Sequence, residues 1–325
     1  MPVEVYGPDF AFLPRAELLS FEEIAIVARA FVDLGARTLR ITGGEPLVRR
    51  HLDRLIGLLR AIELPRRGND LHAGPGRERI DLALTTNGSL LAPLAVSLRE
   101  AGLDRITVSL DSLDPAIAAR MSGSALPLDR VLDGIAAAHA AGFVGIKLNA
   151  VVRRGVNDGG ILDLVEFARE GGHTMRFIEY MDVGTTNGWR LDEVVPASEI
   201  LAIIEARHPV EPIAPSRIGE VATRYRFLDG AGEVGIIASV SAPFCGTCTR
   251  ARVSADGHLY TCLFATEGMP LKPHLRPVAD AGALRSALAE RWGVRDDRYS
   301  ELRGAATGTG SNARGRRVEM FRVGG

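Results

Sequence analysis

The sequence predicts an α/β protein, a partial or complete (β/α) barrel followed by a smaller α+β unit. Between about residues 20 and 180, short apolar runs rich in β-forming residues alternate with amphipathic stretches, which is typical of parallel strands joined by helices. The runs are almost continuously apolar, so we expect both faces of the sheet to be covered. After about residue 195 the alternation changes, and we predict two domains, residues 1–195 and residues 196–325.

The first domain contains strands and helices in regular alternation. Strands are expected at residues 38–42, 80–85, 106–110, 145–151 and 175–180. Helices are expected at residues 21–34, 52–62, 90–101, 131–141 and 162–170. Ser20 and Glu23 form a capping box pattern ahead of the first helix. Residues 65–79 are polar and rich in Gly, Pro and Arg, and we predict a surface loop there.

The second domain combines one helix with several short strands. The helix is expected at residues 198–206, and strands are expected at residues 223–228, 234–240, 251–255 and 258–263. Asp256-Gly257 between the last two strands is typical of a two-residue hairpin turn. We therefore predict a β-hairpin in the part of the chain that also holds the cysteines.

The composition excludes several classes of function. The chain has 325 residues, with 39 basic and 40 acidic side chains and a net charge of −1. This balance provides no general attraction for nucleic acids or anionic membranes, so a polyanion must be bound by a local cluster of cations. No apolar run approaches the roughly 18 to 20 residues that span a bilayer, and no secretory signal is recognisable. We expect a cytoplasmic protein.

The three cysteines form a set with metal-ligand spacing. Cys245-Gly246-Thr247-Cys248 is followed by thirteen residues and then Cys262. Three thiolates can hold an iron–sulfur cube by three corners and leave one iron open, or they can hold zinc with a fourth ligand. His258 is the nearest candidate for that ligand. Buried cysteines without a metal remain the third interpretation.

Polar residues occur at the ends of the predicted strands and inside them. Gly43 and Gly44 follow the first strand, where they would let backbone groups approach a ligand closely. Similar positions in the following strands are occupied by Thr85, Ser109 and Lys147. Polar groups are costly to bury without partners, so such a series favours a ligand inside the barrel. Each of these polar groups could instead form a hydrogen bond within the core.

Arg250 and Arg252 continue the cysteine pair into a predicted strand, so both should point to the same face beside the cysteines. Two guanidinium groups on one face suit a polyphosphate, whereas the alternative is a solvated face with ordinary ion pairs. The chain ends in a basic, Gly-rich segment closed by Gly324-Gly325. Such an end is usually a mobile tail, although a Gly-Gly end can also enter a narrow site.

Together these residues resemble the molybdenum cofactor biosynthesis protein A family, the GTP 3′,8-cyclases of the radical S-adenosylmethionine (SAM) superfamily. The resemblance runs over essentially the whole chain. It is carried by LRITGGEPLVRR, LTTNGSLL, ITVSLDSLD, KLNAVVRRGVND, MRFIEYMDVG, FCGTCTRARVSADGHLYTCLF and the final VGG. It implies a partial (β/α) barrel of the radical SAM type, with a smaller C-terminal α+β domain that carries an iron–sulfur cluster. The implied activity is that of a lyase which cyclises GTP by radical chemistry in molybdenum cofactor (molybdopterin) biosynthesis.

The resemblance also implies site residues and cofactors. The implied ligands of a substrate-binding [4Fe-4S] cluster are Cys245, Cys248 and Cys262. The implied SAM-binding residues are Gly44, Ser109 and Met181. The implied GTP-binding residues are Arg40, Thr85, Lys147, Arg250, Ala251 and Arg252. Gly324 and Gly325 match a tail that in the family enters the active site and assists catalysis.

Ahead of its first helix the family has a strand, a GTP-contacting arginine and a C-x3-C-x2-C loop, and Met-Pro typically follows its last cysteine. This chain begins Met1-Pro2. We therefore expect the missing segment, which would ligate a second [4Fe-4S] cluster, to lie just upstream, and we expect the chain without it to be inactive.

Three alternative functions and a set of expected partners complete the prediction. The chain could be a non-catalytic GTP-binding iron–sulfur remnant or sensor, another radical SAM enzyme, or a zinc-binding structural protein. Expected partners are GTP, an external electron donor and, through the pathway, cyclic pyranopterin monophosphate synthase. Nucleic acids and membranes are not expected, and a homodimer is left open.

Overall fold

A curved eight-stranded sheet organises the protein. The computed structural model describes residues 13–65, 79–123, 127–184, 188–216, 219–306 and 318–319. The sheet has the order β1-β2-β3-β4-β5-β8-β7-β6. The strands are β1 Thr38–Ile41, β2 Asp81–Thr86, β3 Arg105–Ser109, β4 Lys147–Val152, β5 Thr174–Glu179, β6 Val210–Ile213, β7 Thr223–Phe227 and β8 Glu233–Ile237. Neighbours are parallel from β1 to β5 and between β5 and β8, whereas β8, β7 and β6 pair antiparallel.

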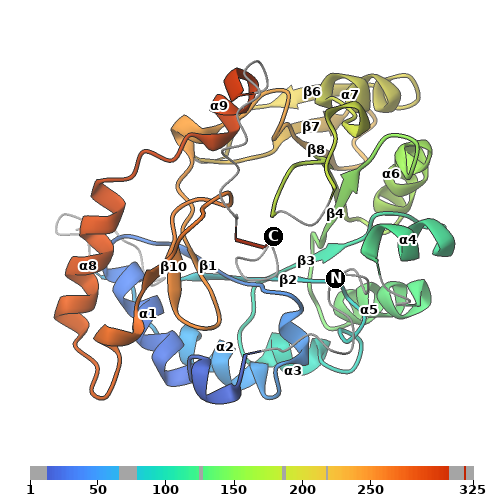
Figure 1. Ribbon diagram of the computed structural model, residues 1–325. Coiled ribbons are helices and arrows are strands. Elements are labelled where there is room, and N and C mark those ends of the chain that lie inside the picture. Colours follow the sequence, from blue (N-terminus) through green and yellow to red (C-terminus); the bar gives the residue numbers. More distant parts are fainter. Residues whose placement is uncertain are drawn as a thin grey trace, which may run out of the picture.

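The helices α1 to α7 cover the outer face of this sheet (Figure 1). They are α1 Phe21–Asp33, α2 Leu52–Arg60, α3 Ala95–Glu100, α4 Pro115–Ser122, α5 Leu128–Ala140, α6 Ile161–Glu170 and α7 Ala197–Glu205. Of the later helices, α8 Ala281–Gly293 packs on α1, and α9 Tyr299–Ala306 lies beside the turn that contains Gly246. Strand residues such as Leu84, Val108 and Leu148 are fully buried in one core with the helices that connect them. The Ser20 capping box is present, because the Ser20 hydroxyl accepts from Glu23 N at 3.1 Å and Ser20 N donates to the Glu23 carboxylate at 2.7 Å. The sheet is thus held from outside, which leaves its inner face for polar side chains.

A smaller antiparallel sheet packs beside the main one. It contains β9 Arg252–Val253, β10 His258–Tyr260 and β11 Met269–Pro270. Its residue Leu259 belongs to a second core, which also contains Val27 of α1 and Leu284 of α8. The segment that follows the first two cysteines is therefore packed against both the beginning and the end of the described chain.

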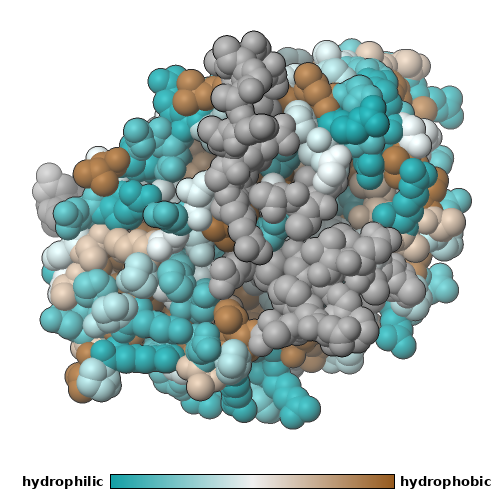
Figure 2. Space-filling model, in the orientation of Figure 1, coloured by the Kyte–Doolittle hydropathy of each residue, from teal (hydrophilic) through white to brown (hydrophobic). Residues whose placement is uncertain are grey.

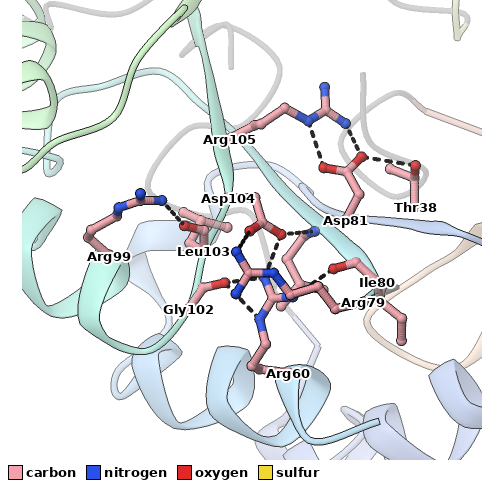
Figure 3. A network of polar contacts seen from close by, with 11 residues as sticks. Thr38, Arg60, Arg79, Ile80, Asp81, Arg99, Gly102, Leu103, Asp104 and Arg105 are labelled. Carbon is pink, nitrogen blue, oxygen red and sulfur yellow. Dashed lines mark hydrogen bonds and ion pairs between the residues drawn. The ribbon is translucent and has the colours of Figure 1, made fainter. Parts of the chain in front are cut away.

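Ion pairs fix the amino ends of the first strands (Figure 3). Asp81, the first residue of β2, accepts from Arg105 Nε at 2.7 Å and from the Thr38 hydroxyl at 3.0 Å. Arg60 at the end of α2 pairs with Asp104 and donates to the carbonyl oxygen of Ile80 at 2.7 Å. These contacts lie at the edge of the sheet opposite to the carboxyl ends, so they stabilise the frame and leave the other edge for chemistry.

The structure confirms the parallel α/β arrangement and each strand predicted between residues 38 and 180, within one or two residues of its ends. It adds α4, α8, α9, β6 and β11, which were not predicted. Two strands predicted for the second domain, now β7 and β8, belong to the main sheet, because β8 pairs with β5. The later strands β9 and β10 belong to the small sheet. The domain boundary at 195/196 therefore stays a prediction.

Residues 66–78 of the predicted loop 65–79 lie outside the described residues. The molecular face shown in Figure 2 is mainly hydrophilic over the outer helices, with scattered hydrophobic residues, as is usual for a folded protein. None of the helices in the described ranges has the length and apolar character needed to cross a membrane. The cytoplasmic location itself stays a prediction.

Candidate functional site

Polar side chains of four neighbouring strands meet on the inner face of the sheet. Arg40 of β1 donates from Nη1 to the Thr85 hydroxyl of β2 at 2.8 Å and to the Thr107 hydroxyl of β3 at 3.3 Å. Thr85 is in register with Thr107, and Thr107 is in register with Lys147 of β4. The structure therefore brings together three of the predicted GTP-binding residues. Thr107 was not predicted, although its place in an otherwise apolar strand was the available signal.

This inner face is strongly cationic around Lys147. The pKa of Lys147 is lowered to about 8, mainly by burial and also by the positive charges of Arg176, Arg105 and Arg40, against an opposing effect of Glu220. Arg176 of β5 donates from Nε to the Asn149 side-chain oxygen at 2.9 Å. Such a concentration of positive charge is unfavourable without a counter-charge, so it favours an anionic ligand.

The predicted SAM-binding residues lie at the carboxyl ends of alternate strands. Gly44 follows β1, Ser109 ends β3, and Met181 comes two residues after β5. The turn that contains Gly44 is docked on the next strand end, because the Glu45 carboxylate accepts from the Thr86 hydroxyl at 2.7 Å and from Asn87 N at 2.7 Å. In parallel α/β sheets this edge carries the ligand site, so the placement is consistent with SAM binding. SAM binding by these residues stays a prediction.

The cysteines approach this site from the second half of the chain. Cys245 opens a short 3₁₀ turn, Cys245–Thr247, and Cys248 follows directly, whereas Cys262 lies two residues after β10. Burial raises the pKa of Cys248, but the charge of Arg250 and hydrogen bonds from Arg250 and Arg295 lower it to about 7. Burial raises the pKa of Cys262, and the charge of Cys245 contributes to the rise. The three sulfur atoms therefore share one electrostatic neighbourhood.

Within the part of the chain that the structure describes, no group of three or more His, Cys, Asp and Glu side chains is arranged so that it could hold a metal ion. The donor types nevertheless fit an iron–sulfur cluster, because cysteine thiolates are its usual ligands and three of them leave one iron corner without a protein ligand. His258, the alternative zinc ligand, faces Asp256 with Nδ1 3.3 Å from Oδ2. Ligation by Cys245, Cys248 and Cys262 stays a prediction.

Two arginines lie beside the cysteines. The pKa of Arg252 is lowered to about 10, mainly by burial and also by the nearby charge of Arg250. The charges of Cys248 and Cys262 oppose this shift. The predicted strand 251–255 is shorter than expected: β9 begins at Arg252, so Arg250 and Ala251 precede it. The Arg250 guanidinium lies 5.3 Å from the centre of the Phe244 ring, and its Nε is buried without a hydrogen-bond partner in the described structure. An unpaired buried N–H favours an additional acceptor, such as a phosphate oxygen.

Sequence analysis missed several residues that support this region. Glu179 at the end of β5 is fully buried and accepts from Ala197 N, Val240 N and Ser241 N at 2.7 to 2.8 Å. A single acidic residue in the apolar run MRFIEY was the signal that could have identified it. The predicted catalytic residues Gly324 and Gly325 lie outside the described residues.

Comparisons with protein families divide the chain between two models. The family described as the Radical SAM superfamily matches residues 6–168, and the family described as Molybdenum Cofactor Synthesis C matches residues 173–301. The first match ends within the last turn of α6, and the second begins just ahead of β5. The cationic row on β1 to β4 therefore lies in the first match, and all three cysteines lie in the second.

Curated relatives match over the whole chain. A GTP 3',8-cyclase of Acidothermus cellulolyticus is 51% identical over 345 residues, which cover 100% of this chain and 91% of the relative. A GTP 3',8-cyclase of Xanthomonas axonopodis pv. citri is also 51% identical, with the same coverage. One of Staphylococcus haemolyticus is 42% identical over 326 residues, again with 100% and 91% coverage.

Solved structures share the fold at low sequence identity. SuiB of Streptococcus suis bound to S-adenosylmethionine superposes with a TM-score of 0.54 and 14% identity over 91% of this chain and 62% of SuiB. A second SuiB structure gives a TM-score of 0.52 and 16% identity over 88% of this chain and 62% of SuiB. This likeness supports a partial barrel fold of the radical SAM type.

Proposed function

Because this chain belongs to the GTP 3′,8-cyclase family of the radical SAM superfamily, we propose that its cationic inner face and its cysteine set form one site for GTP. The protein is a radical SAM enzyme of the lyase class in molybdenum cofactor biosynthesis. The family uses SAM and an iron–sulfur cluster. When bound, SAM and a cluster would supply the radical chemistry that removes the ribose 3′-hydrogen of GTP, with the electron coming from an external reductant.

The observation that carries the proposed GTP site is the row formed by Arg40, Thr85, Thr107 and Lys147 across four strands. A nucleoside triphosphate brings a charge of about −4 at neutral pH, because each phosphate is largely ionised. Arg40 and Lys147 on one side and Arg250 and Arg252 on the other provide four positive groups for it. A site with local balance of this kind is consistent with a chain that is almost neutral as a whole.

The remaining residues take the parts implied for them. Cys245, Cys248 and Cys262 would hold a cluster with one iron left without a protein ligand and available to the guanine base. Ala251 lies between the two arginines that would contact GTP. Gly44, Ser109 and Met181 bind SAM at the carboxyl edge of the sheet. Gly324 and Gly325, which lie outside the described residues, assist catalysis. An external reductant supplies the electrons, and cyclic pyranopterin monophosphate synthase uses the product.

The proposed GTP site is tested by measuring the affinity for GTP of two lysine variants by calorimetry. Lys147→Met is expected to weaken GTP binding by at least about tenfold, because a buried cation is lost from the row. Lys272→Met is the matched control, since Lys272 lies in the short turn Lys272–His274, outside the proposed site. Equal affinities for the two variants would contradict the proposed site.

The metal is tested by iron and zinc analysis of anaerobically prepared protein. About four irons per chain without zinc are expected for one [4Fe-4S] cluster, and Cys262→Ser is expected to lower that content severalfold. Zinc in place of iron would support a structural zinc protein instead.

A second candidate function is GTP binding on one cluster without catalysis. It is favoured by the count of cysteines, since the three in this chain all belong to the set Cys245, Cys248 and Cys262. Anaerobic incubation with GTP, SAM and dithionite is made with this chain fused behind the C-x3-C-x2-C segment of the family, because without that segment both candidates predict no product. Formation of 5′-deoxyadenosine and of cyclised GTP by the fused chain supports the enzyme, whereas GTP binding without either product supports the second candidate.

A further inference from the structure

The last described helix lies against the loops that carry the cysteines. The Glu301 carboxylate of α9 accepts from Gly246 N at 2.9 Å, inside the turn between Cys245 and Cys248. Arg295, just ahead of α9, donates from Nη1 to the carbonyl oxygen of Cys248 at 2.5 Å. The backbone of the C-x2-C pair is thus fixed at Gly246, between the two cysteines, and at Cys248 by side chains that lie some fifty residues further along the chain.

Tyr299, the first residue of α9, contacts the other two parts of the site. Its hydroxyl donates to Asp182 Oδ2 at 2.6 Å, and Asp182 directly follows the predicted SAM-binding residue Met181. Its ring stacks on Phe264, with centroids 4.6 Å apart and an interplanar angle of 29°. Phe264 N in turn donates to Cys262 Sγ at 3.4 Å. Tyr299 therefore joins the end of β5 to the segment that presents the third cysteine.

These side chains are themselves held in place. Arg298 Nε donates to the second Glu301 carboxylate oxygen at 2.6 Å. Arg295 is oriented by Asp297, which accepts from its Nε at 3.1 Å, and by the Trp292 ring, 4.7 Å from its guanidinium carbon. Neither buried core includes a described side chain of α9. The contacts of this segment are therefore directed at the cysteine loops more than at general packing.

We propose that Arg295, Tyr299 and Glu301 are positioning residues that hold the two cysteine loops in the geometry needed to bind and keep the iron–sulfur cluster. The inference rests on the proposed function, because it takes Cys245, Cys248 and Cys262 as cluster ligands. It assigns a specific part to residues 295–301. Two charged groups fix the backbone of the C-x2-C turn, and one aromatic residue sets the position of Cys262 relative to β5.

The experiment measures cluster occupancy and cluster retention in the full chain. Because all three cysteines belong to this set, bound iron reports on this site alone. Glu301→Ala and Tyr299→Leu are reconstituted anaerobically beside the wild-type chain. We then measure iron, acid-labile sulfide and the rate of iron loss to a chelator. We also measure the absorption at about 400 nm, which arises from charge transfer between thiolate and iron in such clusters. Circular dichroism and the melting temperature report whether each variant folds.

Conservative variants separate positioning from folding. Glu301→Gln keeps an oxygen that can accept from Gly246, and Tyr299→Phe keeps the stack on Phe264 while removing the hydroxyl. Glu290→Ala on α8 is the matched control, since Glu290 is exposed. We expect Glu301→Ala and Tyr299→Leu to lose iron at least about threefold faster than wild type, Glu301→Gln to be close to wild type, and Glu290→Ala to be unchanged.

The outcomes separate this inference from the proposed function. A wild-type chain that holds its cluster, with folded Glu301→Ala and Tyr299→Leu variants that hold it equally well, would overturn the inference and leave the cluster site intact. Loss of iron in Glu290→Ala to the same extent would also overturn it, because the effect would then be general. A wild-type chain that takes up no iron would overturn the proposed cluster site together with the inference.

Discussion

Single polar residues inside apolar strands were the most informative feature of the sequence. Lys147 and Thr85 stood out because an apolar core tolerates such residues only with partners, and the structure shows both on the inner face. Arg176 was not assigned, although its charge contributes to the same field. The sequence places such a residue on a strand face, but which strands become neighbours is decided by the fold.

The protonation of Lys147 leads to a prediction about pH. Its pKa is lowered to about 8, so the positive charge that would face a triphosphate is lost as pH rises through that value. The phosphates are already fully ionised there, because their last ionisation lies near pH 6. We expect the affinity for GTP to fall by about tenfold between pH 7 and pH 9, measured by calorimetry.

Lys147→Arg provides the control for this pH dependence. Arginine stays protonated over the whole range, so the affinity of the variant should change little between the same two pH values. An equally steep fall in both proteins would show that another group is responsible. The comparison is made between slopes, because the shape of arginine also differs from that of lysine.

Among the elements, the parallel strands were predicted best and the short or peripheral pieces worst. In β2 to β5 the apolar residues that pack against the helices are buried, and the ends of these strands are marked by glycines and polar residues. Helix α4 contains no buried residue, and α8 buries only Leu284 and Leu288. Neither helix therefore has the wide apolar stripe from which an amphipathic helix can be predicted.

The cysteine region shows a different limit of prediction. The spacing of Cys245, Cys248 and Cys262 identified the set, and Asp256-Gly257 identified the hairpin between β9 and β10. The supporting contacts from Arg295, Tyr299 and Glu301 cross long stretches of chain, and nothing in local periodicity indicates them. Long-range polar contacts of this kind depend on the complete fold.

Glu179 links three elements and leads to a prediction about stability. Its buried carboxylate accepts from Ala197 N at the start of α7 and from Val240 N and Ser241 N after β8. Glu179→Gln replaces one acceptor oxygen with an NH₂ group that faces N–H donors. We expect the free energy of unfolding to fall by about 2 to 4 kcal/mol, measured by urea denaturation.

Glu199→Gln on α7 is the matched control for Glu179. Glu199 is half-exposed and pairs with Arg154, with 2.6 Å between its Oε2 and Arg154 Nη2. Solvent screens such a pair, so the same substitution there should cost less than about 1 kcal/mol. Equal losses in the two variants would contradict the role given to Glu179.

At the scale of the whole molecule, the second half of the chain completes the architecture of the first. β8 pairs in parallel with β5, so β6 to β8 extend the sheet that begins at β1. The second core joins α1 to α8 and to Leu259 of the hairpin. Arg276 forms a bidentate ion pair with Glu23 of α1, in which Nε donates to Oε1 at 2.5 Å and Nη2 donates to Oε2 at 3.0 Å. These connections indicate a molecule that unfolds as one unit.

Leu284→Ala tests that cooperativity. Leu284 is fully buried in α8, so its truncation leaves a cavity and is expected to lower the free energy of unfolding by about 2 to 5 kcal/mol. Because the second core connects both halves of the chain, calorimetry should show one transition that moves to lower temperature as a whole. Val278→Ala, at a residue that is 82% exposed, should leave the transition unchanged. Two separate transitions in Leu284→Ala, with one of them at the wild-type temperature, would instead show that the main sheet and the cysteine region are independently stable.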